Sequence, residues 1–162
     1  RAGGIAKTAA VNSETFRKAF MNILKEGKDV LYLGFSSGLS TTYNSARLAA
    51  EELRGQFPDR KVIVVDSLAA ASGYGLLMDK LADLRDEGKT IEEVRDWAEA
   101  HKKEVHHWFF SSDLTFFIKG GRVSKVSGWF GTVLKICPLL NVDYKGRLIP
   151  RQKLRGILAD EV

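Results

Sequence analysis

The sequence has only one cysteine, Cys137, among its 162 residues. A single thiol cannot form an intramolecular disulfide, and such sparing use of cysteine is typical of a reducing compartment. Long apolar runs are missing too, so we expect no stable insertion into a membrane. The first ten residues are interrupted by glycine and charge, unlike a signal peptide. We therefore expect a cytoplasmic protein.

The chain also lacks internal repeats, low-complexity segments and a concentrated basic region. Its net charge is +5, from 25 basic and 20 acidic residues that are spread along the whole sequence. A nucleic-acid-binding surface usually gathers positive charge on one face and interleaves it with aromatic side chains. No nucleic-acid partner is therefore expected, and the mild basicity favours solubility or an acidic protein partner.

Apolar strands that alternate with amphipathic segments predict an α/β fold. Residues 30–35 and 61–66 have the composition of buried strands, and a helical pattern separates them. This order predicts a right-handed βαβ unit with parallel strands. Further helices are expected from a cap at Ser13, over residues 72–87, and from a Thr90 capping box, with another strand over residues 105–110. The expected class is a layered βαβ domain with a largely parallel sheet.

The pattern changes in the last third of the chain. Residues 119–124 are basic and rich in glycine, as expected of a crossover loop between domains. A hairpin is predicted further on, with its turn at Lys145-Gly146. We expect a first α/β domain over residues 1–118, and the crossover loop with the opening part of a second α/β domain over residues 119–162.

The segment between the first predicted strand and its helix is dense in hydroxyl and small side chains. Backbone N–H groups at such a turn, together with the positive end of the helix dipole, attract an anion. Capping alone needs fewer hydroxyls than this segment offers. We expect a carboxylate or phosphate to bind here, at Ser36 and Ser37. Secondary contacts are expected from the rest of the turn: Gly38, Leu39, Ser40 and Thr41.

An alternative interpretation of the same turn is enzymatic. The run Gly34-Phe35-Ser36-Ser37-Gly38 matches the nucleophile elbow of a serine hydrolase or esterase, and Asp66 and then His106 or His107 follow in the required order. However, no glycine-rich loop after an earlier strand supplies the second oxyanion N–H. A P-loop is excluded because no Gly-Lys-Ser/Thr is present. A structural interaction module is the third possibility.

The three histidines do not form a metal-binding pattern. His106 and His107 are neighbours on a predicted strand, so their side chains point to opposite faces. His101 lies at the end of a predicted helix, where its charge favours the helix dipole. No cluster of cysteines or carboxylates completes a metal site, so neither a metal nor a cofactor is expected.

Six stretches carry the pattern of a known family, in order and across nearly the whole chain. They are residues 36–46, 64–67, 113–114, 119–124, 134–140 and 146–148. Together they resemble the DegV family of bacterial fatty-acid-binding proteins. Relative to that family, the chain is expected to lack an N-terminal strand and most of the C-terminal domain.

The resemblance implies a protein that is not itself an enzyme. It would bury the tail of a long-chain fatty acid, hold the carboxylate near a domain cleft, and present it to a separate fatty acid kinase that forms an acyl phosphate. Thr8 matches a family threonine that helps to hold the carboxylate. The bound fatty acid is the only expected ligand, and each buried CH₂ should contribute about 0.8 kcal/mol.

The basic loop is expected to act outside the fatty-acid pocket. Its cations, Lys119, Arg122 and Lys125, are flanked by glycines that leave the backbone mobile. We expect these three residues to dock the kinase or to meet the phosphate that forms on the bound carboxylate.

Overall fold

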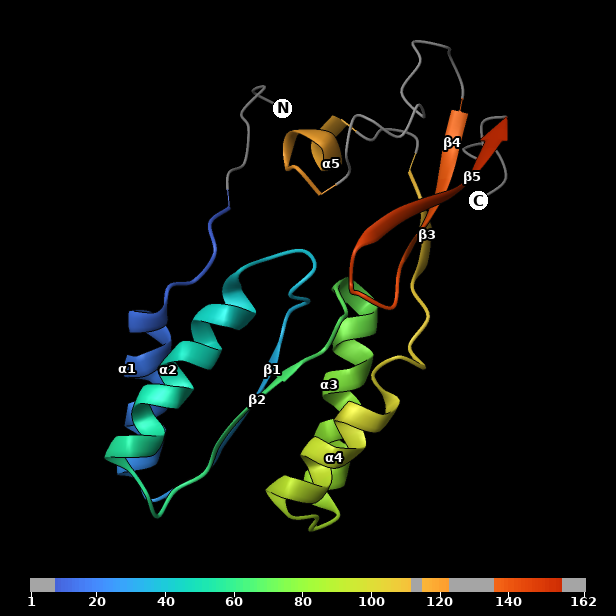
Figure 1. The fold of residues 1–162 in the computed structure, drawn as a ribbon. Helices are drawn as coiled ribbons and strands as arrows, with labels where there is room; N and C mark the ends of the chain where they lie inside the picture. Colours follow the sequence, from blue (N-terminus) through green and yellow to red (C-terminus); the bar gives the residue numbers. More distant parts are fainter. Residues whose placement is uncertain (1–7, 112–114, 123–135, 156–162) are drawn as a thin grey trace, which may run out of the picture.

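The structure is a computed structural model that describes residues 8–111, 115–122 and 136–155 (Figure 1). Within these ranges it contains two sheets and the helices around them, in an α/β arrangement as predicted. The helices are α1 (Ser13–Lys25), α2 (Thr42–Gln56), α3 (Ala71–Asp86), α4 (Ile91–His101) and α5 (Thr115–Lys119); the strands are β1 (Val30–Gly34), β2 (Val62–Asp66), β3 (Trp108–Phe110), β4 (Ile136–Val142) and β5 (Leu148–Arg155).

The predicted βαβ unit is confirmed. Strands β1 and β2 pair in parallel, in a register that runs from Val30 opposite Val62 to Gly34 opposite Asp66. Helices α1 and α2 cover one face of this sheet, while α3 and α4 cover the other (Figure 1). The unit is therefore a three-layer sandwich with a core on each side of the sheet.

The side chains of the two strands alternate between these cores, as the strand period of two requires. Val30 and Val62 pack against α1 and α2, together with three fully buried alanines of α2. Leu33 and Val65 pack against α3 and α4. The small alanine face allows α2 to approach the sheet closely, which buries Leu53 completely.

Local signals set most of the helix ends. The capping box of α4 is confirmed: Thr90 Oγ1 accepts from the N–H of Glu93, and the Glu93 carboxylate accepts from the N–H of Thr90. The N-cap of α1 is Asn12, not the predicted Ser13, because the Asn12 side chain accepts from Thr15 at 2.9 Å. The side-chain acceptor one position earlier thus decides where α1 begins.

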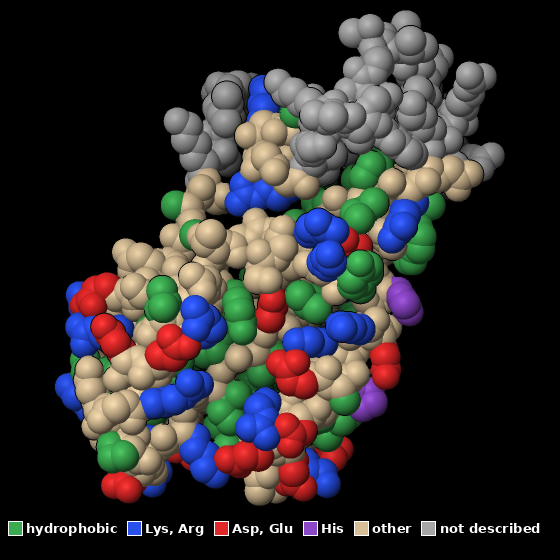
Figure 2. Space-filling view, in the orientation of Figure 1, with side chains coloured by type: hydrophobic (Ala, Val, Ile, Leu, Met, Phe, Trp, Pro, Cys, Tyr) green, Lys and Arg blue, Asp and Glu red, His purple; other side chains and the backbone are tan. Residues whose placement is uncertain are grey.

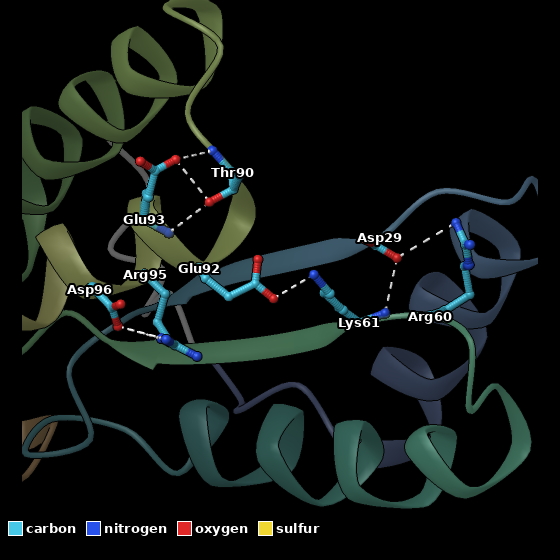
Figure 3. A network of polar contacts seen from close by, with 8 residues as sticks. All are labelled: Asp29, Arg60, Lys61, Thr90, Glu92, Glu93, Arg95 and Asp96. Atoms are coloured by element: carbon cyan, nitrogen blue, oxygen red, sulfur yellow. Dashed lines mark hydrogen bonds and ion pairs between the residues drawn. The ribbon is translucent and has the colours of Figure 1, made fainter.

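Ionic contacts tie the sandwich together at the start of its strands (Figure 3). The backbone N–H of Lys61 donates to the Asp29 carboxylate at 2.9 Å, which connects the entries of β1 and β2. The Lys61 ammonium lies 2.6 Å from the Glu92 carboxylate in the first turn of α4. These contacts lie at the amino ends of β1 and β2, so they leave the carboxyl ends of the two strands available for a binding site.

The second sheet is antiparallel, in the order β3-β4-β5. The strand predicted over residues 105–110 is shorter, and it pairs with β4 rather than joining the parallel sheet. The predicted hairpin is confirmed, with Gly146 at a φ of +71° in its turn. Helix α5, which the sequence did not predict, ends at the start of the basic loop. The division into domains at residues 118 and 119 stays a prediction.

Candidate ligand-binding site

A cavity of about 1280 Å³ lies where the carboxyl ends of β1 and β2 face the second sheet. It exceeds the roughly 300–1000 Å³ of common small-molecule pockets. The second sheet and the segments that follow β1 and β2 line it, and most of the lining side chains are apolar. These include Phe35, Leu39, Leu76, Leu77, Trp97, Val105, Trp108, Phe109, Phe117, Val142 and Leu148. The cavity can therefore hold a long apolar ligand.

A polar patch interrupts this apolar wall at the start of α2. Ser40 Oγ and Thr42 Oγ1 share a hydrogen bond of 2.9 Å, and both residues line the cavity. Arg122 reaches the same place, since its Nε donates to the carbonyl oxygen of Leu39 at 3.3 Å. Within the described residues, the Arg122 guanidinium contacts carbonyl oxygens of Leu39 and Gly120 and no carboxylate. Among these described contacts no carboxylate neutralises its positive charge, which can therefore attract an anion.

The first turn of α3 forms a neighbouring part of the wall, at residues 70–73. Its N-cap is Ala70, whose side chain cannot cap, so the first N–H groups have no side-chain acceptor. Two non-glycine residues here lie in the left-handed region: Leu68 in the preceding loop, at φ +53°, and Ala71 at the start of α3, at φ +47°. Such backbone is costly and persists where surrounding contacts enforce it.

His107 packs directly against this turn. A Cβ built on the buried Gly73 would lie 2.0 Å from Cε1 and 2.3 Å from Nδ1 of His107. Only glycine at this position therefore leaves room for the imidazole ring. Partial burial lowers the pKa of the His107 imidazole, although a backbone hydrogen bond with Ala70 acts in the opposite direction. The ring is therefore neutral at pH 7 and offers the cavity a polar but uncharged edge.

The two residues of the predicted serine pair have different surroundings. Ser36 is completely buried, and its hydroxyl donates to the carbonyl oxygen of Gly146 at 2.7 Å. Ser37 is exposed, and its N–H donates to the Asp66 carboxylate at 3.1 Å. Neither residue lines the cavity in the described part of the chain. This geometry favours Ser40 and Thr42 over Ser36 and Ser37 as contacts for an anion.

The same contacts bear on the hydrolase alternative. A nucleophile elbow presents its hydroxyl to a histidine and to substrate. Here the Ser36 proton is directed to a backbone carbonyl, and His107 packs on Gly73 instead. The Asp66 carboxylate accepts from the backbone of Ser37 and Leu68. The residues that the sequence aligns in triad order are not brought into triad geometry.

The remaining predicted residues divide between the cavity and the surface. Thr8, Leu39 and Ser40 line the cavity, whereas Gly38 and Thr41 do not contribute to the wall that is described. Arg122 points to the cavity, Lys119 is exposed, and Lys125 lies outside the described residues. No group of three or more metal-ligating side chains occurs in the described ranges. No helix there is both long and apolar enough to cross a membrane.

Sequence reasoning missed the first turn of α3, and it considered His107 only for the hydrolase alternative and as a metal ligand. One signal could have located the α3 turn: it follows β2, and the carboxyl ends of parallel strands meet at one edge of a sheet. Nothing in the local pattern around His107 indicates that it faces Gly73, because the two residues belong to different elements.

The family model for an uncharacterised protein of the DegV family matches residues 1–158 of this sequence. The chain belongs to the DegV family. A DegV domain-containing protein of Clostridium perfringens is 40% identical over 156 residues, which cover 96% of this chain and 54% of that relative. A fatty acid-binding protein of Thermotoga maritima is 39% identical over 158 residues, which cover 96% and 53% respectively.

Solved DegV structures have the same arrangement. A DegV lipid-binding protein from Thermotoga maritima superposes with a TM-score of 0.79 at 37% identity, covering 96% of this chain and 52% of that one. The fatty acid kinase B3 protein of Streptococcus pneumoniae, loaded with linoleic acid, gives 0.80 at 32% identity, covering 95% and 53%. The chain thus spans about half the length of the relatives it matches.

Proposed function

We propose that this DegV protein binds a long-chain fatty acid, with the acyl chain in the cavity and the carboxylate at Arg122, Ser40 and Thr42. The observation that carries the proposal is a large, mostly apolar cavity whose wall brings the Arg122 guanidinium close to the hydroxyls of Ser40 and Thr42. Thr8 also lines this cavity and offers a further hydroxyl. Fatty-acid binding by the relatives from Thermotoga maritima and Streptococcus pneumoniae supports the choice of ligand.

The two ends of the ligand contribute differently to affinity. Each methylene removed from water contributes about 0.8 kcal/mol, so a long chain supplies most of the binding free energy. A charge-assisted bond to Arg122 adds roughly 1.5–3 kcal/mol and fixes which end of the ligand faces the patch.

We also propose that the bound fatty acid is presented to a fatty acid kinase. The support is the likeness to the kinase B3 protein of Streptococcus pneumoniae. Lys119 ends α5 with its side chain exposed, on the same short segment as Arg122. That placement suits a contact with an acidic partner beside the carboxylate, while Arg122 faces the ligand. We therefore propose separate roles for two cations that the sequence assigned together to the basic loop.

A binding assay with matched ligands and variants tests the proposal. Arg122→Gln should weaken binding of oleic acid about 10- to 100-fold, because it removes one charge-assisted bond. It should weaken binding of the uncharged methyl ester much less. Lys119→Gln is the matched control, since it removes an exposed cation from the same segment and should leave both affinities unchanged.

Two results would contradict the proposal. One is the absence of any fatty acid in lipid extracted from the purified protein and analysed by mass spectrometry, together with no binding of added oleic acid. The other is an equal loss of acid and ester affinity in Arg122→Gln, which would show that the guanidinium shapes the cavity without contacting the carboxylate.

A further inference from the structure

The hydrogen bonds of Ser36 join three segments that are far apart in the sequence. Its N–H donates to the carbonyl oxygen of Ala69 at 3.0 Å, beyond the end of β2. Its hydroxyl donates to the carbonyl oxygen of Gly146 at 2.7 Å, in the β4–β5 turn, and accepts from the N–H of Gly38 at 3.2 Å. Ser36 therefore links the loops after β1 and β2 to the hairpin of the second sheet.

The contact is too close for any side chain larger than hydrogen on either glycine. A Cβ built on Gly38 would lie 2.5 Å from the carbonyl oxygen of Lys145, and one built on Gly146 would lie 2.0 Å from Ser36 Oγ. Gly146 also has a φ of +71°, which disfavours any other residue. The two loops thus meet backbone to backbone, with the Ser36 hydroxyl between them.

Each of the three joined segments continues directly into the cavity wall. Leu39 and Ser40 follow Ser36, residues 70–73 follow Ala69, and Val142 and Leu148 flank the β4–β5 turn. Ser36 itself is fully buried and does not line the cavity. Its carbonyl oxygen also accepts from the N–H groups of Leu39 and Ser40, both at 3.1 Å, which sets the path of the loop that carries the polar patch.

We propose that Ser36 is a positioning residue that holds the hairpin of the second sheet against the parallel sheet and thereby sets the fatty-acid cavity. It acts without contacting the ligand. The proposal rests on the proposed function for the identity of the ligand. The link that Ser36 makes between the two sheets does not depend on which ligand binds. It differs from the carboxylate contact expected from the sequence, since the hydroxyl proton already has a buried acceptor.

The test compares two adjacent serines. Ser36→Ala leaves the carbonyl oxygen of Gly146 and the N–H of Gly38 without their partner, whereas Ser37→Ala changes an exposed hydroxyl. Ser36→Ala should weaken the binding of oleic acid and of its methyl ester by the same factor. That factor is about tenfold, which corresponds to the loss of one buried hydrogen bond. Gly146→Ala should reproduce this loss, and Ser37→Ala should leave both affinities unchanged.

Hydrogen exchange adds a readout that requires no ligand. Ser36→Ala should speed exchange of the Gly38 amide and of residues 144–147 about tenfold, and leave α1 unchanged. If Ser36→Ala does not fold, Ser36→Cys keeps the volume with a weaker donor and should show the same local pattern. If Ser36→Ala weakened the binding of oleic acid but not that of its methyl ester, Ser36 would be a carboxylate contact and the proposal would be overturned. Unchanged exchange at residues 144–147 would overturn it as well, whereas a wild type that binds no fatty acid would refute only the proposed function.

Discussion

Replacing Gly73 by alanine tests the packing of His107 against α3. In an exposed helix, Gly→Ala stabilises the protein by about 1 kcal/mol, because glycine loses more backbone entropy on folding. At Gly73 the new methyl group would lie 2.0 Å from His107 Cε1, so the ring must move. Overpacking costs roughly 1–3 kcal/mol and an off-rotamer side chain about 0.5–1.5 kcal/mol more. We expect a net destabilisation of about 1–3 kcal/mol.

The same helix supplies the control. Gly75 lies two residues further along α3, and a Cβ built on it would have no atom within 4 Å. Gly75→Ala should therefore raise the free energy of unfolding by about 0.5–1 kcal/mol. Urea denaturation followed by circular dichroism measures both variants. The melting temperature should change by about 2–4 °C per kcal/mol. It should fall in Gly73→Ala and rise in Gly75→Ala.

A double mutant isolates the contact itself. In the His107→Ala background the space beside Gly73 is open, so Gly73→Ala should no longer destabilise. The double-mutant cycle should give a coupling free energy of about 1–3 kcal/mol. If Gly73→Ala were as stable as Gly75→Ala, the close contact between Gly73 and His107 would be wrong, and with it the account of this part of the cavity wall.

Three other outcomes are expected. Thr90→Ala should lower stability by about 1 kcal/mol, measured by urea denaturation, because it removes the capping box of α4. Burial alone would raise the pKa of the Asp143 carboxyl, but bonds from Arg147 lower it overall. Its contribution to stability is therefore complete above the unfolded pKa of about 3.9 and is lost as pH falls through the lower folded value; Asp143→Asn should flatten this acid dependence in melts below pH 5. Lys119→Gln should slow acyl phosphate formation by the kinase at unchanged fatty-acid affinity, and an unchanged rate would remove Lys119 from the docking surface.

The sequence alone determined the elements whose signals are local. Apolar runs and the helical pattern between them predicted the parallel pairing of β1 and β2, because a βαβ connection requires it. The capping box at Thr90 and the hairpin turn at Lys145-Gly146 are also set by neighbouring residues. The match over residues 1–158 confirms the family resemblance, and the likeness to a solved DegV structure confirms the α/β fold class.

Only the tertiary structure decided which polar groups face the cavity. Ser36 and Ser40 are indistinguishable in a hydroxyl-rich turn, yet the first is directed to a carbonyl oxygen 110 positions away and the second lines the wall. Arg122 lines the cavity with its guanidinium bonded to the carbonyl oxygen of Leu39, which lies 83 positions away. Local patterns carry no information about such distant pairs, since a hydrogen bond is decided by where the backbone of the other sheet comes to lie.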